Sequence, residues 1–129
     1  MATELPLRIV DSVTELGPQD AGCIGVTGSH GGLSSARFAA ASRPLLVVFN
    51  DAGIGREQAG IAGLALLQAE GIAACTVAHT SARIGDAQST WSDGIITHAN
   101  ARALALGVRA GLACQAAVAL AQNTSRRPL

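Results

Sequence analysis

Residues 44–56 read Pro44-Leu-Leu-Val-Val-Phe-Asn-Asp-Ala-Gly-Ile-Gly-Arg56, and this stretch decides the fold. Its first half is a run of apolar, β-prone residues that stops abruptly at Asn50 and Asp51. An apolar run without polar alternation is typical of a strand that is covered on both faces. We therefore interpret it as the central strand of a sheet, and the residues from Asn50 onward as the loop that leaves it.

Outward from this strand, the sequence predicts an alternation of strands and helices. Further strands are expected over residues 5–13, 23–27, 72–78 and 95–97, and helices over residues 34–42, 57–70, 98–106 and 112–122. The polar stretch that ends at Asp93-Gly94 and contains Trp91 is expected to be an excursion over the surface. Right-handed crossovers make strands in such a series parallel. The expected fold class is α/β: three layers, with a mostly parallel sheet and helices on both faces, as in Rossmann-like or flavodoxin-like domains.

The length and composition of the chain indicate how many domains it has and which partners are not expected. A chain of 129 residues is most simply a single domain, 1–129. Nine acidic residues balance nine basic ones, all of them Arg, which argues against nucleic acid as a partner. No apolar run reaches the roughly 18 residues that span a bilayer, and the N-terminus has no export signal, so no membrane partner is expected.

The three cysteines are expected to be reduced core residues. Cys23, Cys75 and Cys114 lie in apolar or Ala-rich runs without CxxC spacing. Reduced thiols favour a cytoplasmic location. Gly- and Ala-rich faces over residues 57–70 and 112–122 are suited to close packing against another copy or against another protein, and a homo-oligomer is expected.

Candidate functional residues follow three predicted strands. Because the carboxyl ends of parallel strands meet at one edge, where open α/β sheets place their ligands, these side chains are expected to converge. They are Ser29 and His30 after the first, Asn50 and Asp51 after the second, and His79, Ser81, Arg83 and Asp86 after the third. We predict Asp51 and His30 as the catalytic pair. The predicted substrate-binding residues are Ser29, Gly31, Gly32, Asn50, Ser81, Arg83 and Asp86.

Each prediction has a purely structural alternative. The turn Gly28–Gly32 precedes a helix and is suited to an anion, but its glycines are equally suited to a tight turn. Asp51 is suited to proton transfer or to capping the next helix. Arg83 and Asp86 either hold a carboxylate between them or form an ion pair that stiffens the loop.

No metal or cofactor is predicted. The glycine turn matches neither the Walker A pattern nor the dinucleotide-binding GxGxxG pattern. His30, Asp51, His79 and Asp86 lie at no spacing that is diagnostic of a metal site.

Three motifs occur in order along the chain: Gly28-Ser-His-Gly-Gly32, Asn50-Asp-Ala-Gly-Ile-Gly55 and Ser81-Ala-Arg-Ile-Gly-Asp86. Together they resemble a family of small bacterial α/β proteins to which no function is assigned. The resemblance covers nearly the whole chain and implies no catalytic residue.

The function expected from the residues is an enzyme for a small anionic metabolite, a carboxylate or a phosphate. Acid–base chemistry at the carboxyl edge of the sheet, as in a lyase, isomerase or hydrolase, fits an Asp–His pair beside an anion-binding turn. The alternative is a non-catalytic subunit that binds a ligand or stabilises a partner protein.

Overall fold

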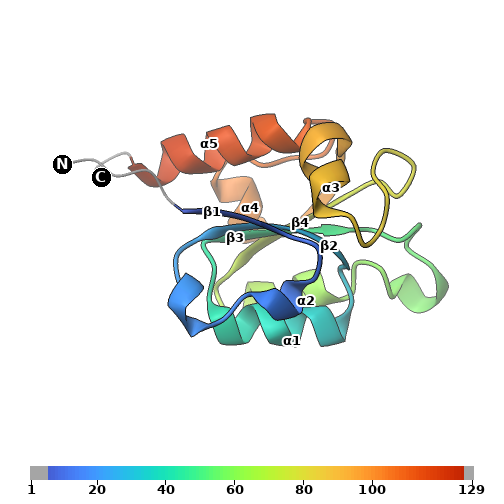
Figure 1. Ribbon diagram of the computed structural model, residues 1–129, viewed down its shortest axis with the longest axis horizontal. Coiled ribbons are helices and arrows are strands. Elements are labelled where there is room, and N and C mark those ends of the chain that lie inside the picture. Colours follow the sequence, from blue (N-terminus) through green and yellow to red (C-terminus); the bar gives the residue numbers. More distant parts are fainter. Residues whose placement is uncertain (1–5, 127–129) are drawn as a thin grey trace.

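The computed structural model describes residues 6–126, and these form a five-stranded sheet between two layers of helices (Figure 1). The strands are β1 (Leu7–Val10), β2 (Ile24–His30), β3 (Leu46–Asn50), β4 (Ala73–Val77) and β5 (Ile96–Ala99). The helices are α1 (Leu33–Ser42), α2 (Gly63–Ala69), α3 (Ala87–Asp93), α4 (Ala101–Ala105) and α5 (Cys114–Arg126), with short 3₁₀ turns η1 (Val13–Glu15), η2 (Pro18–Asp20) and η3 (Arg56–Gln58). The predicted three-layer α/β class is confirmed.

The strand order in the sheet is the order in the chain, β1-β2-β3-β4-β5. The first four strands are parallel, and β5 runs antiparallel to β4. The parallel strands β1 to β4 follow one another across the sheet in the same direction. Right-handed crossovers between them therefore all lie on the same face. Accordingly η1, α1 and α2 lie on one face, while α3, α4 and α5 cover the other (Figure 1).

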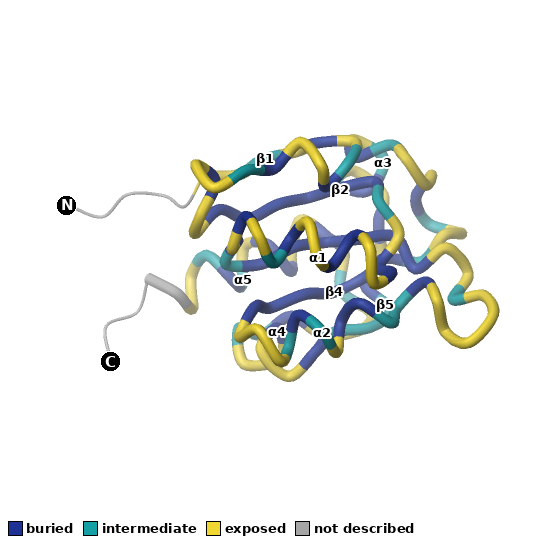
Figure 2. Tube along the Cα trace, turned by 90° about the horizontal axis from the view of Figure 1, so that it is seen from below, coloured by how far each residue is buried: buried dark blue, intermediate teal, exposed yellow. Residues whose placement is uncertain are grey.

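The central strand supplies both cores, because alternate side chains of a strand point to opposite faces. Leu46 and Val48 belong to the cluster that includes Ala117 and Val118 of α5. Val47 and Phe49 belong to the cluster that includes Leu67 of α2. All five residues of β3 are buried, and Figure 2 shows β2, β3 and β4 as the buried centre of the molecule. This burial on both faces explains the absence of polar alternation in the sequence.

Several predicted boundaries are wrong. The strand expected to end at residue 27 continues as β2 to His30, because Gly28 lies within the strand and packs closely against the backbone of Gly85 and Asp86. The stretch through Asp93 is the helix α3, since the Asp86 side chain caps its first turn, and Trp91 packs against the core cluster beneath α5. The helix expected from residue 57 begins at Gly63, because residues 52–58 follow a strained, left-handed path.

The remaining differences lie at the ends of elements. The first strand is β1, four residues long, and residue 5 of the predicted range lies outside the described part of the chain. The strand expected over residues 95–97 and the helix expected over residues 98–106 are β5 and α4. Nothing in the sequence indicates that β5 is antiparallel, because short apolar strands look alike in either direction.

The three cysteines are buried and free, as predicted. Burial raises the pKa of the Cys23 thiol to about 11 and that of Cys114 to about 12, and it raises the pKa of Cys75 well above its ordinary value. Over residues 6–126, no helix has both the length and the apolar character needed to cross a membrane.

Candidate functional site

The connections that follow β3 and β4 leave the sheet toward opposite faces. The chain after β3 runs to α2 on one side, and the chain after β4 runs to α3 on the other side (Figure 1). In open α/β sheets, a crevice forms between neighbouring strands whose connections diverge in this way. Asp51 directly follows β3, and His79 follows β4 by two residues. Both residues therefore lie at the carboxyl edge of the sheet, where these two connections diverge.

Asn50, the last residue of β3, joins the two diverging loops. Its side chain is fully buried. Its Nδ2 donates to the carbonyl of Ala82 at 3.0 Å, and its Oδ1 accepts from the amide of Ala52 at 2.8 Å. Both ends of this predicted substrate-binding side chain are thus used within the protein, where they fix the loop after β3 against the loop after β4.

The Asp51 carboxylate is buried and held by three donors. Its Oδ1 accepts from the amides of Gly53 at 2.8 Å and His79 at 3.1 Å, and its Oδ2 accepts from the hydroxyl of Thr97 at 3.1 Å. Burial by itself raises the pKa of this carboxyl group. The two amides, the hydroxyl and the nearby His79 ring outweigh burial, and they hold the pKa of Asp51 below its ordinary value. Asp51 is therefore a carboxylate at neutral pH.

The His79 imidazole is the titratable group in contact with this carboxylate. Its Nδ1 lies 3.4 Å from Asp51 Oδ1, and 54% of its side chain is exposed, against 7% for Asp51. The ring lies against Gly53, where an added Cβ would stand 3.4 Å from Cε1. Since Nδ1 faces the carboxylate, Nε2 is the ring nitrogen left for a ligand or for water.

A pair of threonines supports the other carboxylate oxygen. Thr97 of β5 and Thr76 of β4 have their hydroxyl oxygens 2.9 Å apart. Because Thr97 donates its proton to Asp51, Thr76 donates to Thr97. The register shift between β4 and β5 at this point brings Thr97 opposite the end of β3. Sequence reasoning missed both threonines, since only the pairing of β4 with β5 brings them to Asp51.

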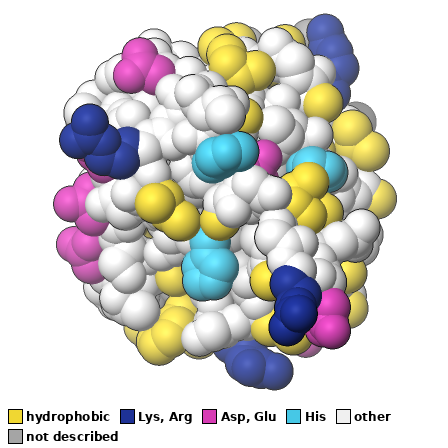
Figure 3. All heavy atoms as spheres, turned by 90° about the vertical axis from the view of Figure 1, so that its right-hand side faces the viewer, with side chains coloured by type: hydrophobic (Ala, Val, Ile, Leu, Met, Phe, Trp, Pro, Cys, Tyr) yellow, Lys and Arg dark blue, Asp and Glu magenta, His cyan; other side chains and the backbone are white. Residues whose placement is uncertain are grey.

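His30 lies at the same edge of the sheet, beside a hollow that neither Asp51 nor His79 lines. This hollow measures about 390 Å³, and its lining residues are Asp11, Ser12, Gly28, Ser29, His30, Ile84 and Gly85. The Ser29 hydroxyl oxygen accepts from the Val13 amide at 2.9 Å, which leaves its proton free to be donated. Over residues 6–126, the histidine ring in contact with the Asp51 carboxylate is that of His79 and not that of His30. Figure 3 shows histidine side chains gathered on one face of the molecule, among mostly uncharged surface.

The glycine turn is packed tightly into the fold. A Cβ on Gly31 would stand 2.7 Å from the Gly60 carbonyl, and one on Gly63 would stand 2.4 Å from the Gly32 carbonyl. The Gly31 amide donates to Asn50, and the Gly31 carbonyl accepts from Gly63. These contacts explain the glycines structurally. They place the turn against the start of α2, with His30 Nε2 beside Gly32.

The other predicted binding residues are spread over the loop after β4. The Ser81 hydroxyl donates to the Ala78 carbonyl at 2.7 Å and accepts from the Ile95 amide at 3.0 Å. Arg83 is exposed, and Asp86 accepts from the Ser89 amide as the N-cap of α3. In the described chain no ion pair joins Arg83 to Asp86, so the structure gives Asp86 the helix-capping role.

Comparisons with family models, curated proteins and solved structures found no significant match to this chain. The chemistry open to the site therefore follows from its geometry alone.

That geometry favours acid–base chemistry. Within residues 6–126 no three His, Cys, Asp or Glu side chains are grouped so that they could hold a metal ion. A buried carboxylate beside the Nδ1 of an exposed imidazole is the arrangement found in catalytic triads, in which the other ring nitrogen exchanges the proton. Such a pair accepts or delivers a proton at Nε2, at a surface that a small molecule can reach.

Proposed function

We propose that this protein is an enzyme that acts on a small anionic metabolite by general acid–base chemistry. The observation that carries the proposal is the contact between the buried Asp51 carboxylate and the exposed His79 ring. In this proposal His79 transfers the proton through Nε2, and Asp51 is the residue that positions it. The reaction is a lyase, isomerase or hydrolase step in which no cofactor takes part.

Thr97 and the loop after Asp51 support this assignment. The hydrogen bonds from Thr76 to Thr97 and from Thr97 to Asp51 keep the carboxylate turned toward the imidazole. Residues Ala52, Ile54, Glu57 and Gln58 all have positive φ without being glycine. Each such residue costs roughly 1–2 kcal/mol, and strain of this kind is concentrated at functional sites. The strained loop begins at the carboxylate that the mechanism needs.

The anionic character of the substrate is supported by the groups near His30. The imidazole lies beside Gly32, the N-cap of α1, which provides no side-chain cap to the first turn of that helix. Uncapped amides and the positive end of a helix favour an anion. Arg83 is exposed on the neighbouring loop. We propose that His30, Ser29 and Arg83 contact the substrate, while His79 performs the proton transfer.

The experiment that tests this function does not depend on the identity of the substrate. Small carboxylates and phosphates are first screened for an increase in melting temperature of the wild-type protein. A ligand at about 100 times its Kd adds about 2.7 kcal/mol, which corresponds to roughly 10 °C for a domain of this size. Each ligand that stabilises the protein is then incubated with it in D₂O and followed by proton NMR. Acid–base turnover replaces a carbon-bound proton by deuterium or yields a product.

The controls separate catalysis from binding. We expect His79→Gln to retain ligand binding and to lower turnover by about 10²–10⁴-fold, the usual contribution of a positioned acid–base group. Gln115→Ala, an exposed position on α5, is the matched control and keeps wild-type turnover. Turnover that survives His79→Gln refutes the role of His79. A ligand that binds and shows neither exchange nor product in the wild type favours the non-catalytic subunit.

We also propose that the protein self-associates in the cytoplasm. Phe38 on α1 is 49% exposed, and a second copy that packs on this helix would remove its side chain from water. The free cysteines fit a reducing compartment. Gly60 and Gly63 pack inside the fold, so they do not provide this interface. Light scattering after size-exclusion chromatography, with Phe38→Ser for comparison, tests the association.

A further inference from the structure

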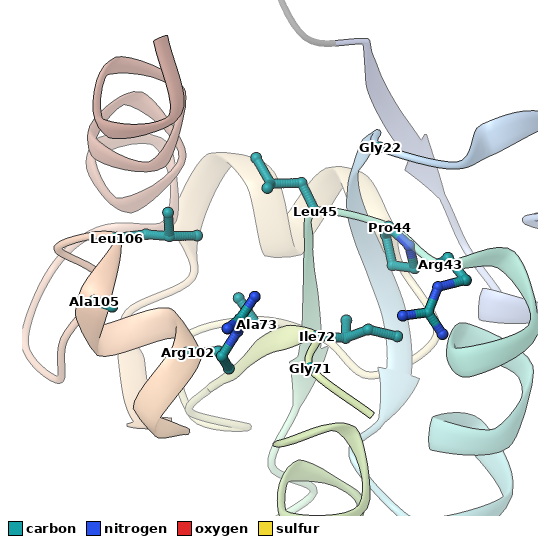
Figure 4. A pocket seen from close by; sticks show the side chains of 10 residues that line it. All are labelled: Gly22, Arg43, Pro44, Leu45, Gly71, Ile72, Ala73, Arg102, Ala105 and Leu106. Atoms are coloured by element: carbon teal, nitrogen blue, oxygen red, sulfur yellow. The ribbon is translucent and has the colours of Figure 1, made fainter. Parts of the chain in front are cut away.

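A second hollow lies at the opposite end of the sheet, where β3 and β4 begin. Its volume is about 480 Å³, which is within the range of small-molecule sites. Leu45, Ile72 and Ala73 contribute an apolar surface (Figure 4). At about 3.3 Å per residue, the five residues of β3 put this hollow roughly 15 Å from Asp51. It is therefore separate from the proposed catalytic site.

Two arginines flank this hollow. Arg43 is the C-cap residue of α1, and Arg102 lies on α4. Figure 4 shows them on opposite sides, with the apolar residues between them. No acidic residue is among those that line the hollow. Its walls therefore carry two positive charges across an apolar centre.

Among the described residues, the Arg102 guanidinium is free to bind a ligand, and the Arg43 guanidinium is held by Glu70 alone. In the part of the chain that the structure describes, the Arg102 guanidinium has no hydrogen-bond or ion-pair partner, and only its backbone amide is engaged, with Gln68. The Arg43 guanidinium donates to the Glu70 carbonyl at 3.2 Å and lies 3.9 Å from Glu70 Oε1. Because both Arg43 and Glu70 are more than half exposed, this ion pair holds Arg43 weakly.

We propose that this hollow binds an organic molecule with an anionic group at each end and an apolar middle. Arginine is suited to each end, because its planar fork of donors matches a carboxylate or a phosphate. The Leu45–Ile72–Ala73 surface is suited to the middle, since it releases water when a methylene chain covers it. This site goes beyond the proposed function and is independent of His79.

The test is isothermal titration calorimetry of the wild-type chain with a series of dicarboxylates: succinate, glutarate, adipate and pimelate. Butanoate, pentanoate, hexanoate and heptanoate are the matched ligands with one charge. We expect one dicarboxylate length to bind best, and the monocarboxylate of equal length to bind about tenfold more weakly, since one charge-assisted contact is lost. Equal affinity for monocarboxylates and dicarboxylates overturns the proposal. The absence of binding by the whole series at about 10 mM overturns it as well.

Variants locate the binding. Arg102→Gln and Arg43→Gln are each expected to weaken the best dicarboxylate by about tenfold. Ala105→Glu, which places a negative charge at an exposed lining position, is expected to weaken it as well. Arg109→Gln, an exposed arginine outside the hollow, is the matched control.

Arg83→Gln, which changes a proposed substrate contact of the catalytic site, separates this proposal from the proposed function, and it is expected to leave dicarboxylate affinity unchanged. A loss of affinity in Arg83→Gln, with wild-type affinity in Arg102→Gln, assigns the ligand to the carboxyl edge and overturns the second site. Wild-type affinity in both Arg43→Gln and Arg102→Gln overturns it equally.

Discussion

Asp51→Asn removes one negative charge at the candidate site while it keeps the shape of the side chain. The Asn oxygen is able to take the place of Oδ1 and accept from the amides of Gly53 and His79. Thr97, which donates to Oδ2, has to turn its proton elsewhere, because an Asn amide group donates as well. The backbone should therefore be unchanged, and the loss should be electrostatic.

The magnitude follows from the three donors. A hydrogen bond to a charged group contributes about 1.5–3 kcal/mol, and one between neutral groups about 0.5–1.5 kcal/mol. Summed over three bonds, and offset by the cost of burying the charge, the loss is about 1–2 kcal/mol at neutral pH. For a domain of this size that corresponds to a fall in Tm of roughly 4–8 °C. Asp93→Asn, at an exposed position on α3, should change Tm by less than about 2 °C.

The sign of the pH dependence is fixed by the lowered pKa of Asp51. Its ordinary value is 3.8, and the folded protein holds it lower. A carboxyl group of this kind stabilises the fold at every pH above its unfolded value, and the contribution is lost as the pH falls through the folded value. The Tm difference between wild type and Asp51→Asn should therefore be fully present at about pH 5, and it should shrink in stronger acid as the pH falls through the folded pKa of Asp51. Thermal unfolding at several pH values, followed by circular dichroism, measures it. A difference that persists unchanged in strong acid would refute the electrostatic reasoning.

Two further substitutions test the loop that follows the candidate carboxylate. Gly60→Ala would place a Cβ 1.8 Å from the Asp51 carbonyl, so we expect the free energy of unfolding to fall by more than about 3 kcal/mol in urea denaturation. Gly25→Ala meets only the flexible end of Leu16, at 3.0 Å, and should cost clearly less; equal losses would contradict the steric argument. Gln58→Gly relieves a residue at φ 60 and should raise stability by about 0.5–1 kcal/mol, whereas Ala119→Gly, at an exposed position in the interior of α5, should lower it by about 1 kcal/mol. If both glycine substitutions destabilise the protein alike, the loop is not strained.

The sequence predicts the layers of this fold well, because burial on both faces leaves a direct mark on β3. It predicts the direction of β5 and the path of residues 52–58 poorly. The pattern of apolar residues in a four-residue strand carries no information on the direction of the strand. Residue propensities do not predict a positive φ at Ala52 and Ile54. Both features are set by tertiary contacts that form only in the assembled sheet.

The sequence alone also predicts part of the candidate site. Asp51 and His79 each follow a buried strand, which is enough to bring them to one edge. Which histidine faces Asp51 depends on the connections after β3 and β4 leaving toward opposite faces, and no local pattern encodes that. Thr97 was out of reach for the same reason, since its role depends on the register between β4 and β5.

The sequential strand order has a consequence for the synthesis of the chain. Each new parallel strand leaves the ribosome in time to pair with the strand made just before it, so the sheet is able to grow from β1 to β4 without rearrangement. The layer over Leu46 and Val48 closes last, because α5 is translated after all five strands. Until then the part of this face that α5 covers presents aliphatic side chains to water. The nascent chain therefore passes through a stage that a chaperone for apolar surfaces would bind, and that stage ends when α5 docks.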